Sequence, residues 1–170
     1  MALLDICTYP NPVLRQKAKS VKNIDTSLQR FIDDMIDTMY DAPGIGLAAN
    51  QVGRPLSVII VDIQREECEY GLIVLINPEL VSAQGEVSYE EGCLSVPDYF
   101  ATVKRNGEIV VRGLDRDGNE IRIAANGMLA IALQHEMDHL EGKLFIDRIN
   151  PVARDIFKRR WKKKLKEEQG

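Results

Sequence analysis

The stretch Gln134-His135-Glu136-Met137-Asp138-His139-Leu140-Glu141-Gly142 decides the fold, and it contains both histidines of the chain. His135 and His139 are four residues apart, so on an α-helix they lie on one face and can bind one metal ion. Glu136 lies roughly 100° around such a helix from His135. Its carboxylate can then exchange a proton with a water on the metal without being a ligand itself.

The residues before this motif indicate that its helix is buried, because they are almost all apolar: Met128, Leu129, Ile131, Ala132 and Leu133. In one interpretation, His135 and His139 are hydrogen-bonded histidines of an ordinary core. A buried pair of imidazoles with a carboxylate between them needs compensation, however, and a divalent cation provides it. The metal site is therefore the favoured interpretation.

The two histidines need a further ligand, and the downstream sequence does not offer a good one. The longer metallopeptidase signature H-E-x-x-H-x-x-G-x-x-H has a third histidine where this chain has Phe145. Glu167 and Glu168 lie in a lysine-rich terminal segment. Upstream, Cys93 is the remaining candidate. A lone cysteine is more often a small buried hydrophobe, but a Cys/His/His set leaves one tetrahedral position open, as in catalytic sites.

Composition indicates one globular domain without a secretion or membrane segment. The chain has 170 residues, of which 45% are hydrophobic and 28% charged. Its N-terminus lacks a basic segment followed by an apolar one, and no apolar run approaches the ~18 residues of a membrane span. The three cysteines are irregularly spaced. They argue against a disulfide framework and for a reducing, cytoplasmic location.

Charge is unevenly distributed along the chain. Residues 151–170 contain eight Lys/Arg and three Asp/Glu, a net charge of +5, whereas the whole chain has −4, which leaves −9 for residues 1–150. An acidic body with a basic terminal segment indicates a partner for that segment rather than general affinity for nucleic acid.

The order of expected elements predicts an α+β fold. Mainly antiparallel strands would surround the buried helix that carries the metal motif, with one helix before them and one after. We expect helices at about 27–41, 126–141 and 152–168, after an extended arm at 6–14. Strands are expected at 57–63, 72–77 and 84–90, followed by a hairpin of 109–114 and 120–124.

A glycine-rich segment follows the first helix and ends in an amide: Gly44-Ile45-Gly46-Leu47-Ala48-Ala49-Asn50-Gln51. Its small residues would let a ligand approach the backbone closely. A phosphate-binding loop is disfavoured, because no lysine follows and no strand leads directly into it. A tight turn needs glycine just as often, so this segment alone does not establish a ligand site.

Three segments together resemble the signature motifs of the polypeptide deformylase family. They are G-x-G-x-A-A-x-Q at Gly44–Gln51, E-G-C-L-S at Glu91–Ser95 and Q-H-E-x-D-H-L-x-G at Gln134–Gly142, in the family's order. The resemblance covers about residues 4–150. It implies a metal-dependent hydrolase that removes the N-formyl group from newly made formylmethionyl polypeptides. Residues 1–150 would be one catalytic domain, and 151–170 a basic helix that extends it.

The resemblance also implies roles for individual residues. Cys93, His135 and His139 would bind the metal, and Glu136 would be the general acid/base. Gln51 and the backbone N–H of Leu94 would stabilise the oxyanion.

The positions that match the family's substrate pocket are Gly44, Ile45, Gly46, Tyr89, Met128, Ile131 and Ala132, with Glu91 at the rim. Tyr89 and Met128 are less usual there. Asp98 stands where glycine is common and Phe100 where some relatives have arginine, so the outer subsites differ from the family pattern.

The ligand set suits iron, zinc, cobalt or nickel. The resemblance implies Fe²⁺ natively, replaceable by Zn²⁺, Ni²⁺ or Co²⁺.

The resemblance also implies that the basic terminal helix contacts the ribosome; the alternative is that this helix is simply charged and solvated. We expect a monomer without a membrane partner. Two other classes of function are an ordinary H-E-x-x-H metallopeptidase and a ribosome-associated protein with a structural metal.

Overall fold

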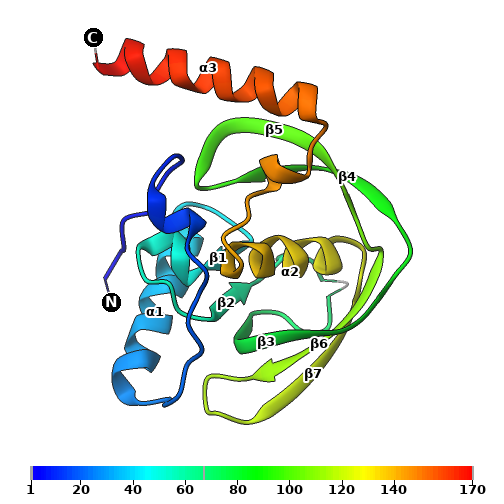
Figure 1. The fold of residues 1–170 in the computed structure, drawn as a ribbon. Coiled ribbons are helices and arrows are strands. Elements are labelled where there is room, and N and C mark those ends of the chain that lie inside the picture. The colour runs from blue at the N-terminus through cyan, green and yellow to red at the C-terminus, as the bar shows by residue number, and fades with distance from the viewer. Residues whose placement is uncertain (1, 67, 170) are drawn as a thin grey trace.

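The structure is a computed structural model that describes residues 2–66 and 68–169; Met1, Glu67 and Gly170 lie outside the described residues. A five-stranded antiparallel sheet lies between helix α1 (Thr26–Asp41) on one face and helix α2 (Gly127–Leu140) on the other (Figure 1). The predicted α+β class is confirmed. The helix that carries the metal motif lies at the centre of the molecule.

The five-stranded sheet has the order β1-β2-β3-β6-β7. Its strands are β1 (Gly46–Ala48), β2 (Val58–Val61), β3 (Ile73–Gln84), β6 (Glu108–Leu114) and β7 (Glu120–Asn126). In β2, Val58 and Ile60 pack towards α1, whereas Ile59 and Val61 pack towards α2. Side chains alternate along a strand, so a strand covered on both faces is apolar at every position.

A separate ribbon of two strands, β4 (Val87–Cys93) and β5 (Val96–Arg105), covers the other side of α2. The terminal helix α3 (Pro151–Gln169) packs on this part through the buried Phe157, which contacts a third apolar cluster with Val96, Val103 and Phe145. β4 ends at Cys93, so the packing of this ribbon against α2 determines how far the Cys93 sulfur lies from the helix.

Two strand predictions need correction, and two strands were missed. β3 continues through Asn77 and Pro78 to Gln84, so the strand expected at 84–90 begins at Val87 instead. β5 and the short β1 were not predicted. Asn77 has a left-handed φ of 52°, and the pairing of β3 with β6 shifts between Ile76 and Glu79. β3 is therefore irregular at Asn77-Pro78, the place where the sequence predicted the end of a strand.

The helix ends follow local chemistry. Asp25 caps α1 by accepting a hydrogen bond from the Leu28 N–H at 2.9 Å. After α2, Gly142 has φ 74°, and a Cβ there would lie 2.5 Å from the Arg15 carbonyl oxygen. Glycine is therefore required at the position where the motif ends. In the expected extended arm, Pro12–Arg15 instead form a short 3-10 helix.

Within the described ranges, none of the helices combines the length and the apolar character that crossing a bilayer would require.

Candidate metal centre and active site

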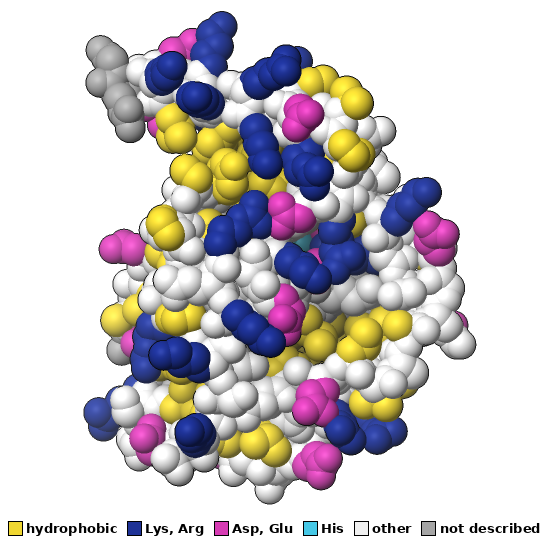
Figure 2. Space-filling view, viewed as in Figure 1, with side chains coloured by type: hydrophobic (Ala, Val, Ile, Leu, Met, Phe, Trp, Pro, Cys, Tyr) yellow, Lys and Arg dark blue, Asp and Glu magenta, His cyan; other side chains and the backbone are white. Residues whose placement is uncertain are grey.

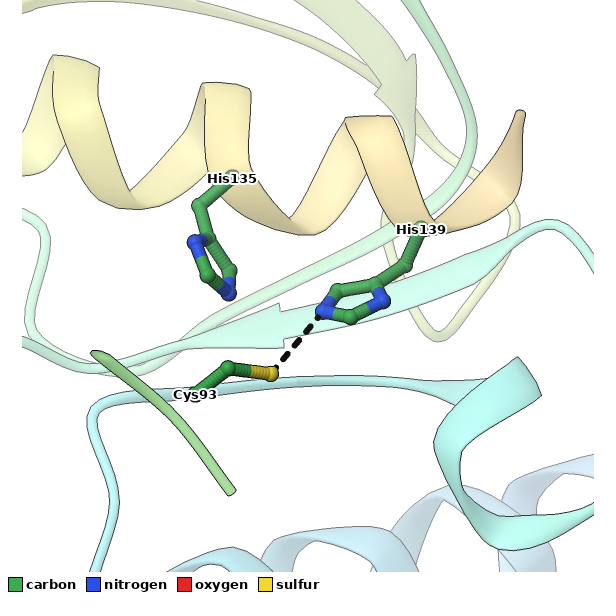
Figure 3. Close-up of side chains that lie close together, drawn as sticks. All are labelled: Cys93, His135 and His139. Carbon is green, nitrogen blue, oxygen red and sulfur yellow. Dashed lines mark hydrogen bonds between the residues drawn. The ribbon is translucent and has the colours of Figure 1, made fainter. Parts of the chain in front are cut away.

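The structure brings Cys93, His135 and His139 together. The two histidines project from successive turns of α2 towards the Cys93 sulfur at the end of β4 (Figure 3). One potential ligand atom from each residue lies within 4.8 Å of the other two, and Cys93 Sγ is 3.4 Å from His139 Nε2. Sulfur and nitrogen ligands of one tetrahedral metal are separated by roughly 3.5 Å. The three side chains thus fit a metal ion.

The charge environment also suits a cation. Burial opposes a charged imidazole, but the Glu136 carboxylate and the Cys93 sulfur raise the pKa of His135 well above its usual value. Burial and the neighbouring His135 lower the pKa of His139 well below its usual value. The negative groups around His135 therefore favour a positive charge at this place, which a bound cation would also provide.

Glu136 follows His135 on α2, and its carboxyl group is also buried. Burial raises its pKa to about 7. Among the described residues, its Oε1 and the Nδ1 of His139 are buried without a hydrogen-bond partner. A Cβ on Gly46 would lie 2.5 Å from Glu136 Oε2, so glycine at this position leaves room for the carboxylate. A buried carboxyl group with one free oxygen can donate or accept a proton near neutral pH.

A chain of ion pairs, largely buried except at Arg148, supports the first histidine. Glu91 accepts a hydrogen bond from His135 Nδ1 at 2.9 Å and is held by Arg105 through two contacts of 2.8 Å. Arg105 also donates to Asp138 at 2.6 Å, and Arg148 donates to the same carboxylate. Burial opposes the ionisation of Glu91, but the Arg105 hydrogen bonds lower its pKa overall. Ionised Glu91 fixes the orientation of the His135 ring.

A cavity of about 520 Å³ opens beside these groups. Every predicted substrate-pocket residue lines it, as do Gln51, Leu94, Cys93, His135 and Glu136; the pocket set is Gly44, Ile45, Gly46, Tyr89, Glu91, Met128, Ile131 and Ala132. Asp98 and Phe100 also line it. Apart from His139, which does not line this cavity, the residues predicted for binding and for chemistry therefore share it.

A larger groove of about 710 Å³ lies on the far side of Arg105. Its charged side chains largely neutralise one another: Lys17 pairs with Glu141, Lys104 with Glu86, and Arg148 with Asp138. Cys93, His135 and His139 do not line this groove. The smaller cavity is the candidate active site.

The family model for polypeptide deformylase matches residues 3–155. The chain belongs to this family. It is 71% identical over 167 residues to the peptide deformylase of Syntrophobacter fumaroxidans, and the alignment covers 98% of each sequence. As a member of this family the chain is an enzyme, a metal-dependent hydrolase of protein biosynthesis.

Solved structures of the family have the same fold. The peptide deformylase of Legionella pneumophila is 46% identical with a TM-score of 0.89, covering 99% of this chain and 98% of its own. That of Ehrlichia chaffeensis, solved in complex with actinonin, is 40% identical with a TM-score of 0.90, covering 96% and 98%.

The fold also explains why this deformylase site differs from a longer metallopeptidase motif. Phe145 stands at the position of the third histidine, is buried, and stacks on the His135 ring with centroids 6.1 Å apart. It forms an apolar wall instead of a ligand.

The sequence interpretation missed Ser95 as a partner of Gln51, and it missed Asp138 and Arg148, which extend the ion pair of Arg105 with Glu91. For Asp138, the available signal was its place within the third motif.

Proposed function

We propose that Cys93, His135 and His139 hold a divalent metal with which this chain removes the formyl group from the N-terminal formylmethionine of new polypeptides, releasing formate. The observation that carries the proposal is that these three potential ligands and Glu136 meet beside one cavity. When bound, the metal would polarise the formyl carbonyl and make water a better nucleophile. The residues of the chain would then orient the substrate and move the protons.

Glu136 is suited to the proton transfers. Its unpartnered Oε1 would accept the proton of the attacking water and later give it to the leaving amine of the peptide. The amide of Gln51 and the backbone N–H of Leu94 would donate hydrogen bonds to the oxygen that gains charge. Each such donor contributes about 3–4 kcal/mol to catalysis in well-studied enzymes.

The peptide would bind as an added strand. Within residues 2–66 and 68–169, β1 is an edge strand of its sheet and β4 pairs with β5 alone, so each strand has one unpaired edge. Ile45 and Gly46 at the start of β1 and Tyr89 in β4 line the cavity. Backbone hydrogen bonds to these edges would align substrates of varied sequence. The apolar side chains of Met128, Ile131 and Ala132 would receive the methionine side chain. Actinonin, the ligand of the Ehrlichia relative, should compete with the peptide for this cavity.

Two variants test the assignment of ligands and proton carrier. Glu136→Gln should retain bound metal but lose most formate release from formyl-Met-Ala. Cys93→Ala should lose the metal as well as the activity. Full turnover by Glu136→Gln would exclude Glu136 as general acid/base, and full metal content in Cys93→Ala would exclude the sulfur as a ligand.

We further propose that the native metal is Fe²⁺, with Zn²⁺, Ni²⁺ or Co²⁺ as replacements. One thiolate and two imidazoles suit all four ions, so the ligands alone do not choose among them. Elemental analysis of anaerobically purified protein should find iron. Zinc alone, with iron-loaded protein no faster than zinc-loaded protein, would contradict this.

The basic helix α3 is proposed to dock the enzyme on the ribosome as an extension of the catalytic domain at 1–150. Lys and Arg side chains cover the helix at the top of Figure 2. Lys162→Glu combined with Lys166→Glu should weaken ribosome binding and reduce its salt dependence while sparing formyl-Met-Ala hydrolysis. The matched control, Lys22→Glu with Lys143→Glu, has the same change of charge elsewhere. Equal affinities of the two double variants would refute docking through α3.

Charge reversal is preferable to deletion of 152–170, because Phe157 and Trp161 on α3 pack against the body of the protein. The proposed cytoplasmic location agrees with three free cysteines, Cys7, Cys68 and Cys93. The proposed monomer is tested by light scattering.

A further inference from the structure

The side chain of Gln51 is held on both sides. Its Oε1 accepts a hydrogen bond from the Ala48 backbone N–H at 2.9 Å, and its Nε2 donates to Ser95 Oγ at 3.1 Å. Nε2 also lies 3.5 Å from Cys93 Sγ. Both Gln51 and Ser95 are buried, so these contacts replace the hydrogen bonds that water would otherwise make.

These contacts determine which way the amide points. The Ala48 N–H can only donate, so the amide oxygen of Gln51 must face it and the NH₂ group must face the other way. One N–H is taken by Ser95. The other is directed at Cys93 Sγ, to which Nε2 donates at 3.5 Å; this is the side on which the candidate metal ligands lie and the formyl oxygen of a substrate would lie.

We propose that Ser95 is a positioning residue, whose hydroxyl holds the Gln51 amide so that one N–H is aimed at the oxygen that gains charge during hydrolysis. The inference rests on the proposed role of Gln51. A donor fixed before the reaction does not need to reorganise during it, and this preorganisation is the source of its catalytic effect.

The backbone around both residues is fixed independently of the hydroxyl. Ser95 lies in the two-residue turn between β4 and β5, and its carbonyl accepts a hydrogen bond from the Tyr9 N–H at 2.7 Å. The Gln51 carbonyl accepts one from the Cys7 N–H at 2.6 Å. Ser95→Ala therefore removes the contact to Gln51 while the arm still holds the turn in place.

The test is a double-mutant cycle with Ser95→Ala and Gln51→Ala, in which kcat and KM for formyl-Met-Ala are measured on proteins of equal metal content. Loss of one oxyanion donor lowers kcat by about 100-fold or more, so loosening it should lower kcat by about tenfold and change KM by less than about twofold. In a Gln51→Ala background, Ser95→Ala should have no further effect. Ser95→Thr, which keeps the hydroxyl, should restore most of kcat.

A second measurement does not depend on turnover. Hydrogen exchange of the Gln51 side-chain amide, followed by NMR and assigned by its loss in Gln51→Ala, should be faster in Ser95→Ala. Thr38→Val is the matched control, because Thr38 is a buried hydroxyl that donates to the Asp34 carbonyl oxygen within α1. It should leave kcat and the Gln51 exchange rate unchanged.

The outcomes separate the two proposals. A native kcat in Gln51→Ala would refute the proposed role of Gln51. If Gln51→Ala is slow but Ser95→Ala has native kcat and exchange, or slows both backgrounds equally, Ser95 does not position Gln51 and the inference fails while the proposed function stands.

Discussion

Replacing Arg105 by methionine tests how much the fold depends on the ion pairs beside the metal ligands. The side chain of Arg105 is 2% exposed, and it contacts Glu91 at 2.8 Å and Asp138 at 2.6 Å. Methionine fills much of the same volume but removes all of these hydrogen bonds. Two carboxylates then stay buried without their shared cation.

The expected cost follows from what each carboxylate retains. Breaking a buried ion pair by removing one partner costs about 3–5 kcal/mol. Glu91 keeps its contact with His135, and Asp138 keeps Arg148, so we expect the lower end of this range. A loss of about 3 kcal/mol in the free energy of unfolding corresponds to a fall in Tm of about 6–12 °C for a chain of this size.

Urea denaturation and thermal melting of the metal-free protein measure this cost without a contribution from metal binding. The control is Arg112→Met, which breaks the Arg112–Glu79 pair, with side chains 49% and 62% exposed. That exposed pair should contribute at most about 1 kcal/mol. If Arg105→Met is no less stable than Arg112→Met, the buried chain from His135 to Arg148 does not stabilise the fold and the reasoning fails.

Three further predictions concern other parts of the molecule. Gly46→Ala would place a Cβ 2.5 Å from Glu136 Oε2, so kcat should fall by about 100-fold at unchanged metal content; a native kcat would contradict it. Phe157→Ala removes a buried ring that packs at a tilt against the rings of Tyr9 and Tyr99, and should cost about 3–5 kcal/mol in urea denaturation; a loss below about 1 kcal/mol would mean that α3 is not packed on the body. Burial and a hydrogen bond to Asp62 raise the pKa of Tyr40 to about 12, so this contact stabilises the fold below about pH 10 and the stabilisation is lost as pH rises towards 12. Asp62→Asn should lower that pKa in a spectrophotometric titration, and an unchanged titration curve would exclude the contact.

The sequence predicted the elements that have a clear period or a clear cap. α1 has apolar residues at helical spacing after Asp25, and α2 carries the two histidines four residues apart. β5 was missed because it begins with Val96-Pro97-Asp98, where proline and a left-handed φ of 63° at Asp98 do not resemble a strand. Its pairing with β4, not its own pattern, makes it a strand.

The residues of the candidate site were predictable from the sequence, but the long-range contacts that hold them in place were not. Spacing suggested the histidines, the search for a further ligand suggested Cys93, and the family resemblance supplied Gln51 and the pocket. The contact of Arg105 with Asp138 joins residues 33 positions apart, and that of Gln51 with Ser95 joins residues 44 apart. Such contacts depend on how the β4–β5 ribbon packs over α2, and no local pattern encodes that packing.

X-ray absorption spectroscopy of the metal-loaded protein tests the central claim most directly. The account predicts one sulfur and two imidazole nitrogen ligands from the chain, with the sulfur signal lost in Cys93→Ala. A metal bound by nitrogen and oxygen alone in the unaltered protein would contradict it.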